Sequence, residues 1–259
     1  MIRAYTFASG KGGTGKTTVT VNLGTALAQF GKETYIVDSD VGMANLGLIL
    51  GLESAPVTLH EVLAGKAKIN DAIYDGPCGV KVVPSGISLQ GFQSADPQRL
   101  KDVMKDLVSR CDFLLIDAPA GLGTDGVIPL AVADEVILVV NPEISSLVDA
   151  LKIKILTEMM GGTVRGAILN RATMENTDLS RQKIENVLGV EVIDIIPEDP
   201  NVRRSAAYKT PIVVKYPESA SARAFMRIAA NIAGVEYTET EEVRKENFID
   251  RLARALFRR

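Results

Sequence analysis

Short apolar runs alternate with amphipathic stretches along most of the chain. Seven runs have the length and apolar character of strands, at residues 2–9, 34–38, 80–84, 112–117, 135–140, 164–170 and 191–196. Several are apolar at almost every position, which is typical of parallel strands covered on both faces. Helical spacing predicts helices at residues 16–30, 97–108, 145–159, 179–188 and 220–233. This alternation predicts an α/β fold with a doubly wound, mostly parallel sheet flanked by helices.

The pattern changes near the end of the chain. Residues 1–235 form one predicted domain, and residues 236–246 lack apolar periodicity and pass from acidic to basic, as a solvated connector does. Residues 247–259 read NFIDRLARALFRR, and their apolar positions fall at helical spacing on one face: Phe248, Ile249, Leu252, Ala255 and Leu256. The sequence therefore predicts a C-terminal amphipathic helix.

Composition excludes several classes of protein. The chain has 259 residues, of which 46% are hydrophobic and 24% charged, as in ordinary globular proteins. It has no apolar run near the roughly 18 residues of a membrane-spanning helix. The two cysteines, Cys78 and Cys111, and the one histidine, His60, exclude a zinc site and a disulfide framework. We expect both cysteines to be buried or half-buried in a reduced cytosol. The first residues have no signal-peptide pattern, which predicts a cytoplasmic location.

Charge is distributed unevenly along the chain. The net charge is −3, but residues 244–259 hold six basic and two acidic residues, which leaves −7 on the rest. An acidic body argues against a general nucleic-acid binder. A basic amphipathic helix after a polar connector is typical of an element that lies on a membrane surface. The alternative is that this helix packs on the body as an ordinary last helix.

Residues 10–17 carry the clearest chemical signal. They read GKGGTGKT and match the phosphate-loop pattern G-x-x-x-x-G-K-[ST], with a predicted strand before it and a predicted helix after it. Glycines let the backbone N–H groups surround phosphates, and the helix presents its positive end to the same anion. Lys16 can reach the outer phosphates, and the Thr17 hydroxyl can ligate Mg²⁺. The predicted nucleotide contacts in this stretch are Gly12, Gly13, Thr14, Gly15, Lys16, Thr17 and Thr18.

Three carboxylates belong with this loop. Asp38 and Asp40 stand at the end of the second predicted strand. Asp117 is the last residue of the predicted strand at residues 112–117. Carboxylates at the carboxyl ends of parallel strands face the ligand crevice of such sheets. They can hold Mg²⁺ through water or orient an attacking water. We therefore predict a magnesium site formed by Thr17, Asp38 and Asp117.

A second lysine, Lys11, stands at the start of the loop. With it the loop resembles the deviant Walker A loop of the MinD/ParA family of P-loop ATPases, which includes septum-site regulators, partition ATPases and the nitrogenase iron protein. Further stretches that resemble the family follow in order over nearly the whole chain, at residues 37–40, 45–46, 117–121, 141–143, 168–171 and 196–199. Together they look most like the septum-site branch of the family.

The resemblance implies ATP and Mg²⁺ as cofactors and assigns roles to individual residues. Lys11 would reach across a homodimer to the partner's ATP, Asp40 would position the hydrolytic water, and Asp117 would hold Mg²⁺ through water. The contacts to the base would come from Asn170, with Pro197 and Asp199 in the loop that closes over it.

Three further positions are interpreted through the resemblance. Glu143 and Asp149 would lie near the ATP-dependent dimer interface, with Asp149 as a possible partner of Lys11 across it. Gly123 departs from the pattern, because bacterial members commonly carry an acidic residue there. Signalling through this part of the chain would then differ, while the role of Asp117 would stay.

The predicted function is an ATPase with weak, Mg²⁺-dependent hydrolysis that works as a dimerisation switch. The ATP dimer would bind the membrane surface through the C-terminal helix and recruit a protein partner, in cell-division site selection. One alternative is a partition-type ATPase that binds DNA non-specifically as an ATP dimer, and the acidic body counts against it. Another is an iron–sulfur electron-transfer ATPase, which needs a cysteine shortly after Asp117 where none follows. The last is a sensor that binds ATP without hydrolysing it.

Overall fold

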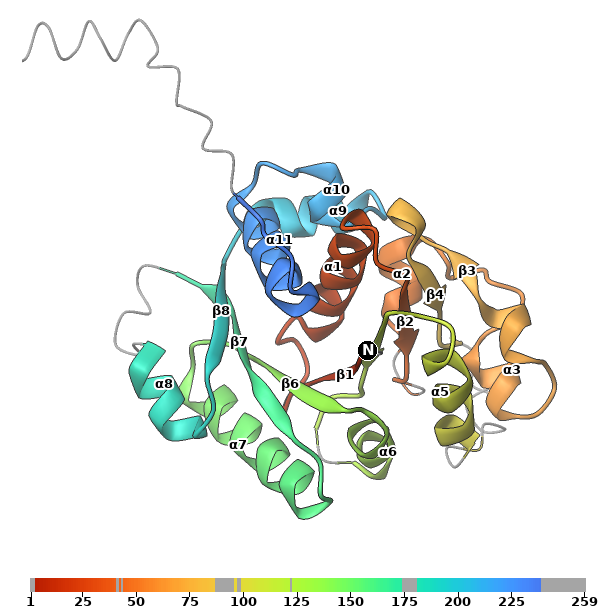
Figure 1. The fold of residues 1–259 in the computed structure, drawn as a ribbon, viewed down its shortest axis with the longest axis horizontal. Coiled ribbons are helices and arrows are strands. Elements are labelled where there is room, and N and C mark those ends of the chain that lie inside the picture. Colours follow the sequence, from red (N-terminus) through yellow and green to blue (C-terminus); the bar gives the residue numbers. More distant parts are fainter. Residues whose placement is uncertain are drawn as a thin grey trace, which may run out of the picture.

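The computed structural model describes residues 3–40, 42, 44–86, 96, 99–121, 123–173 and 181–238. Its centre is one sheet of eight strands in the spatial order β3-β4-β2-β5-β1-β6-β7-β8 (Figure 1). The strands are β1 (Arg3–Ala8), β2 (Thr34–Asp38), β3 (Tyr74–Asp75), β4 (Lys81–Val83), β5 (Phe113–Asp117), β6 (Glu135–Val140), β7 (Val164–Ala172) and β8 (Val192–Pro197). The prediction of a doubly wound α/β sheet is confirmed.

The strand register brings the predicted site residues to one edge of the sheet. All described strand pairs are parallel except β3 with β4. Asp38 at the end of β2 pairs with Asp117 at the end of β5, and Phe7 of β1 pairs with the same Asp117. The carboxyl ends of the central strands therefore meet beside the loop that follows β1.

Helices cover both faces of the sheet (Figure 1). One face carries α1 (Lys16–Gln29), α9 (Pro200–Ala207), α10 (Ile212–Lys215) and α11 (Ala220–Ala233). The other carries α3 (Leu59–Leu63), α5 (Leu100–Val108), α6 (Thr124–Val132), α7 (Ile144–Met159) and α8 (Arg181–Leu188). Both faces hold buried apolar cores, which explains why the central strands are apolar at nearly every position.

Short elements were missed by the sequence pattern. These are α2 (Leu46–Leu50), α3, α6, α9, α10, the two-residue strand β3 and two 3₁₀ turns, η1 (Ile69–Ala72) and η2 (Pro77–Gly79). A helix of four or five residues is too short to show a 3.6-residue period, and α6 contains Pro129. The expectation for Cys78 was wrong, because Cys78 is exposed, whereas Cys111 is buried as expected.

The last described residues pack beside the C-terminal end of α1. The ring of Tyr237 packs edge-on against Phe30, with 6.0 Å between ring centroids. The first residues of the predicted connector therefore touch the body. The amphipathic helix predicted for residues 247–259 lies outside the described residues, so it stays a prediction. Within the described ranges, no helix is long and apolar enough to cross a membrane.

Side chains from α8 occupy the outer main-chain groups at the start of β8. Glu185 Oε1 accepts a hydrogen bond from the Val192 N–H at 3.0 Å, and the Arg181 guanidinium donates to the Val192 carbonyl. Both main-chain groups of Val192 are thereby occupied at the edge of the sheet.

Candidate nucleotide-binding site

The phosphate loop forms a concave surface between β1 and α1. A cavity of about 360 Å³ lies over it and is lined by every residue from Gly12 to Thr18, together with Asp40, Asn45 and Arg171. The N-cap residue of α1 is Gly15, which has no side chain to cap the helix, and the first turn has no acidic residue. The uncapped N–H groups at this helix start suit an anion. The predicted phosphate contacts are thus brought together in one cavity.

Two glycines are required by close approaches of other elements. Gly15 has φ +87°, and a Cβ there would overlap the Asn170 side-chain amide. A Cβ at Gly10 would overlap the side chain and backbone of Asp149 on α7. The loop is therefore held between β7 on one side and α7 on the other, and only glycine fits at both points.

Lys16 is held by Asp117 at the bottom of this cavity. Its Nζ lies 2.7 Å from Asp117 Oδ1, and the two side chains are 7% and 1% exposed. The Thr20 hydroxyl donates to the same oxygen at 3.4 Å. Asp117 Oδ2 is buried and has no hydrogen-bond partner among the residues that the structure describes. An orphaned carboxylate oxygen beside a phosphate cavity fits a hydrated Mg²⁺.

Asp38 completes the acidic end of the site. Its two carboxylate oxygens accept hydrogen bonds from the Asp40 N–H at 3.1 Å and the Leu46 N–H at 3.2 Å. Burial, followed by the neighbouring Asp117 charge, raises the pKa of Asp38 well above its usual range, and Lys16 partly opposes this. Among the described residues no group of three or more His, Cys, Asp or Glu side chains could hold a metal by itself. Any Mg²⁺ here would need oxygens from phosphates and water, which is its usual preference.

Lys11 contacts the start of α7 in its own chain. Its Nζ lies 3.0 Å from Glu143 Oε2 and 3.0 Å from Ser145 Oγ. The side chain is 38% exposed, at the rim of the loop. Asp149, the predicted partner across a dimer, binds Lys152 at 2.9 Å within this chain. The cross-subunit role of Lys11 stays a prediction.

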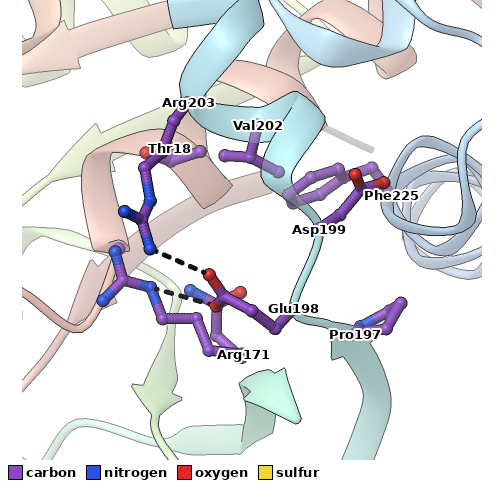
Figure 2. Close-up of a pocket in the computed structure, with 10 residues that line it drawn as sticks. Thr18, Arg171, Pro197, Glu198, Asp199, Val202, Arg203 and Phe225 are labelled. Atoms are coloured by element: carbon purple, nitrogen blue, oxygen red, sulfur yellow. Dashed lines mark hydrogen bonds and ion pairs between the residues drawn. The ribbon is translucent and has the colours of Figure 1, made fainter. Parts of the chain in front are cut away.

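The predicted base contacts line a second, smaller pocket beside the phosphate loop (Figure 2). Asn170 Nδ2 donates to the Thr14 carbonyl at 2.7 Å, which ties the end of β7 to the loop. Asp199 caps α9 by accepting from the Asn201 N–H at 2.8 Å. The complete lining is Gly15, Thr18, Asn170, Arg171, Pro197, Glu198, Asp199, Val202, Arg203 and Phe225.

Sequence reasoning missed several of these lining residues. Arg171 and Glu198 each stand next to a predicted base contact in the sequence. That position is the signal from which their place in the pocket could have been predicted. Val202, Arg203 and Phe225 come from α9 and α11, where the sequence shows ordinary helix residues. Only the packing of these helices against the ends of β7 and β8 brings them to the pocket.

Comparison with known proteins decides the family. The profile of the family described as CobQ/CobB/MinD/ParA nucleotide binding domain matches residues 5–212. This chain belongs to the MinD/ParA family. The resemblance inferred from the loop and the later stretches is thereby confirmed.

Relatives and solved structures agree with this membership. An ATP-binding protein of Methanocaldococcus jannaschii is 51% identical over 259 residues, which is 100% of this chain and 98% of the relative. The septum site-determining protein MinD of Pyrococcus horikoshii, solved in complex with Mg-ADP, is 41% identical with a TM-score of 0.86, over 90% of this chain and 96% of that chain. In the MinC:MinD complex of Aquifex aeolicus, the matching chain is 31% identical with a TM-score of 0.81, over 91% of this chain and 98% of that chain.

One position in this MinD/ParA chain departs from the pattern expected of bacterial members. Gly123, which stands where the resemblance implies that bacterial members carry an acidic residue, is exposed and precedes the first residue of α6. It lines neither the phosphate cavity nor the base pocket. The effect of this glycine on signalling stays a prediction.

Proposed function

We propose that this protein is a Mg²⁺-dependent ATPase that works as a nucleotide-controlled dimerisation switch. The observation that carries this proposal is the buried Lys16–Asp117 pair at the bottom of the phosphate cavity, with Asp117 Oδ2 left open. ATP and Mg²⁺ are the ligands of this site. The ATP-binding relative from M. jannaschii and the Mg-ADP complex of the P. horikoshii protein support that assignment.

Each residue of the site has a definite task in this proposal. The loop N–H groups bind the phosphate chain, and Lys16 leaves Asp117 to reach the outer phosphates. Thr17 and Asp117 would hold Mg²⁺, with Asp38 supporting them from β2. A bound Mg²⁺ neutralises charge on the phosphate oxygens. Asp40, which lines the cavity, orients the water that attacks the last phosphate.

Dimerisation is proposed to proceed through the face that carries Lys11. This lysine is exposed at the rim of the loop and is held by Glu143 and Ser145. A cation at the rim of an anion site can reach the phosphates of a second copy placed face to face. The homodimer would therefore form only when both copies hold ATP.

The output of the switch is proposed to be membrane attachment and recruitment of a protein partner. The basic amphipathic pattern of residues 247–259 supports attachment. One such helix binds weakly, and two in a dimer act together through high effective concentration. The Aquifex MinD was solved with the protein MinC, which supports a protein partner and a role in cell-division site selection.

Liposome co-sedimentation tests this proposal. The full chain and a chain ending at Val243 are mixed with anionic vesicles and either ATP or ADP. Binding that needs both ATP and residues 244–259 is the expected result. If no nucleotide state binds vesicles, the membrane output is wrong. Salt-sensitive co-sedimentation with DNA in the ATP state alone would then favour the partition-type alternative.

A further inference from the structure

Glu198 lies between two arginines beside the base pocket. Its Oε2 is 3.7 Å from Arg171 Nε, and its Oε1 is 3.5 Å from Arg203 Nη2 (Figure 2). Arg171 comes from the end of β7, Arg203 from α9, and Glu198 from the turn between β8 and α9. We call this arrangement the Glu198 bridge. It joins two elements that both contribute to the pocket lining.

Arg171 differs from the other two members by its position. It lines both the base pocket and the phosphate cavity, whereas Glu198 and Arg203 line the base pocket. A nucleotide with its base in one and its phosphates in the other must pass the Arg171 side chain. Arg171, like Gly15 and Thr18, therefore lies at the junction of the two cavities, which the sugar and the first phosphate would span.

The backbone at Arg171 is also unusual. Its φ is +58°, in the left-handed region that arginine seldom adopts. The pairing of β7 with β8 shifts register between Leu169 and Ala172, at the same point. Such backbone is retained when it sets the direction of a side chain that the site needs.

The base pocket is narrow while the bridge is formed. It has a volume of about 30 Å³, which is room for about two water molecules. A purine base is larger, so its entry requires movement of the lining side chains. The bridge residues are the exposed members of that lining, with Glu198 33% and Arg171 48% exposed, and they can move at little cost.

We propose that Arg171 is a nucleotide-binding residue for the segment between the base and the second phosphate, and that Glu198 competes with the nucleotide for it. This inference rests on the proposed nucleotide site. A carboxylate and a phosphate present similar pairs of oxygens to a guanidinium, so one can replace the other. Glu198 thus holds Arg171 at the junction of the two cavities until the nucleotide takes its place.

The test measures the affinity of the full chain for AMP and ADP by displacement of a fluorescent ADP. Glu198→Gln removes the competitor, and we expect both nucleotides to bind roughly two- to fivefold more tightly. Arg171→Gln removes the binding group, and we expect roughly a tenfold or larger loss for both. Arg171→Lys keeps the charge but not the paired donors, so it should recover only part of that loss.

A double variant separates competition from general electrostatics. If Glu198 acts through Arg171, then Glu198→Gln has no effect on affinity in the Arg171→Gln background. A gain that persists there would overturn the inference. Glu191→Gln is the matched control, because Glu191 also lies 3.7 Å from an arginine, Arg181. It removes one negative charge, as Glu198→Gln does, but at the other end of β8. It should leave affinity unchanged.

Three further outcomes have fixed meanings. Equal affinities of Arg171→Gln and the unmodified chain, with unchanged melting temperatures, would also overturn the inference. If the unmodified chain binds neither AMP nor ADP, the proposed function itself fails. A loss of affinity for ADP that AMP does not share would move the contact of Arg171 to the second phosphate and refute the segment assigned here.

Discussion

The buried pair of Lys16 and Asp117 permits a quantitative prediction about stability. Lys16→Met keeps the length of the side chain but leaves the Asp117 carboxylate, 1% exposed, without its cation. Removing one partner of a buried ion pair costs about 3–5 kcal/mol. For a chain of this length, that corresponds to a melting temperature lower by about 10 °C. The double variant Lys16→Met, Asp117→Asn removes both charges and should recover most of the loss.

Urea unfolding of the nucleotide-free protein measures these effects. The midpoint should fall for Lys16→Met and return toward the original value in the double variant, with an unchanged dependence on urea. Lys152→Met is the control, because Lys152 binds Asp149 at a similar distance of 2.9 Å but is 54% exposed. It should cost less than about 1 kcal/mol. Equal losses for the two lysine variants, or additive losses in the double variant, would refute the reasoning.

Four other perturbations probe the same site. Lys11→Ala should remain a monomer with ATP in analytical ultracentrifugation, and a normal ATP dimer would contradict its role across the interface. Asp40→Ala should still dimerise with ATP, while phosphate release falls by roughly 100-fold; unchanged turnover would exclude Asp40 as the water-positioning group. Asp38→Asn should gain stability relative to the unmodified protein as pH rises above about 4, the ordinary pKa of an aspartate. The raised pKa of Asp38 means that the folded state keeps a proton that the unfolded chain releases, so the unmodified protein loses stability in that direction. If the difference in unfolding free energy between Asp38→Asn and the unmodified protein does not change with pH, this explanation is wrong. Gly10→Ala should lower unfolding stability by about 1–3 kcal/mol, because its Cβ would overlap Asp149; a neutral result would mean that the loop moves away from α7 freely.

The sequence was sufficient to predict the candidate site where its residues are continuous along the chain. Residues 12–18 form one loop, so their spacing alone predicted a group of residues that the structure brings together around one cavity. The positions of Asp38 and Asp117 were predictable because both end apolar strands, and parallel strands share their carboxyl edge. Asn170, Pro197 and Asp199 came from resemblance to a family, and the structure places all three in one pocket.

The sequence was insufficient where contacts depend on register and on packing between distant elements. The Lys16–Asp117 pair joins residues 101 positions apart, and it follows from the pairing of β1 with β5. The contact of Lys11 with Glu143 requires α7 to begin beside the loop. The positive φ of Arg171 has no local signature, since nothing in the neighbouring residues demands a left-handed backbone. Such features become visible only in three dimensions.

The occupied main-chain groups at the start of β8 have a consequence for how copies of this protein can associate. An unpaired edge strand is a template on which another chain can add a strand, and that route leads to open-ended aggregates. Here Glu185 and Arg181 occupy the main-chain groups of Val192, and the opposite end of the sheet is the two-residue strand β3. Addition of a strand at Val192 or at β3 is therefore disfavoured. Self-association is thereby left to the loops and helices, where a ligand can control it and reverse it.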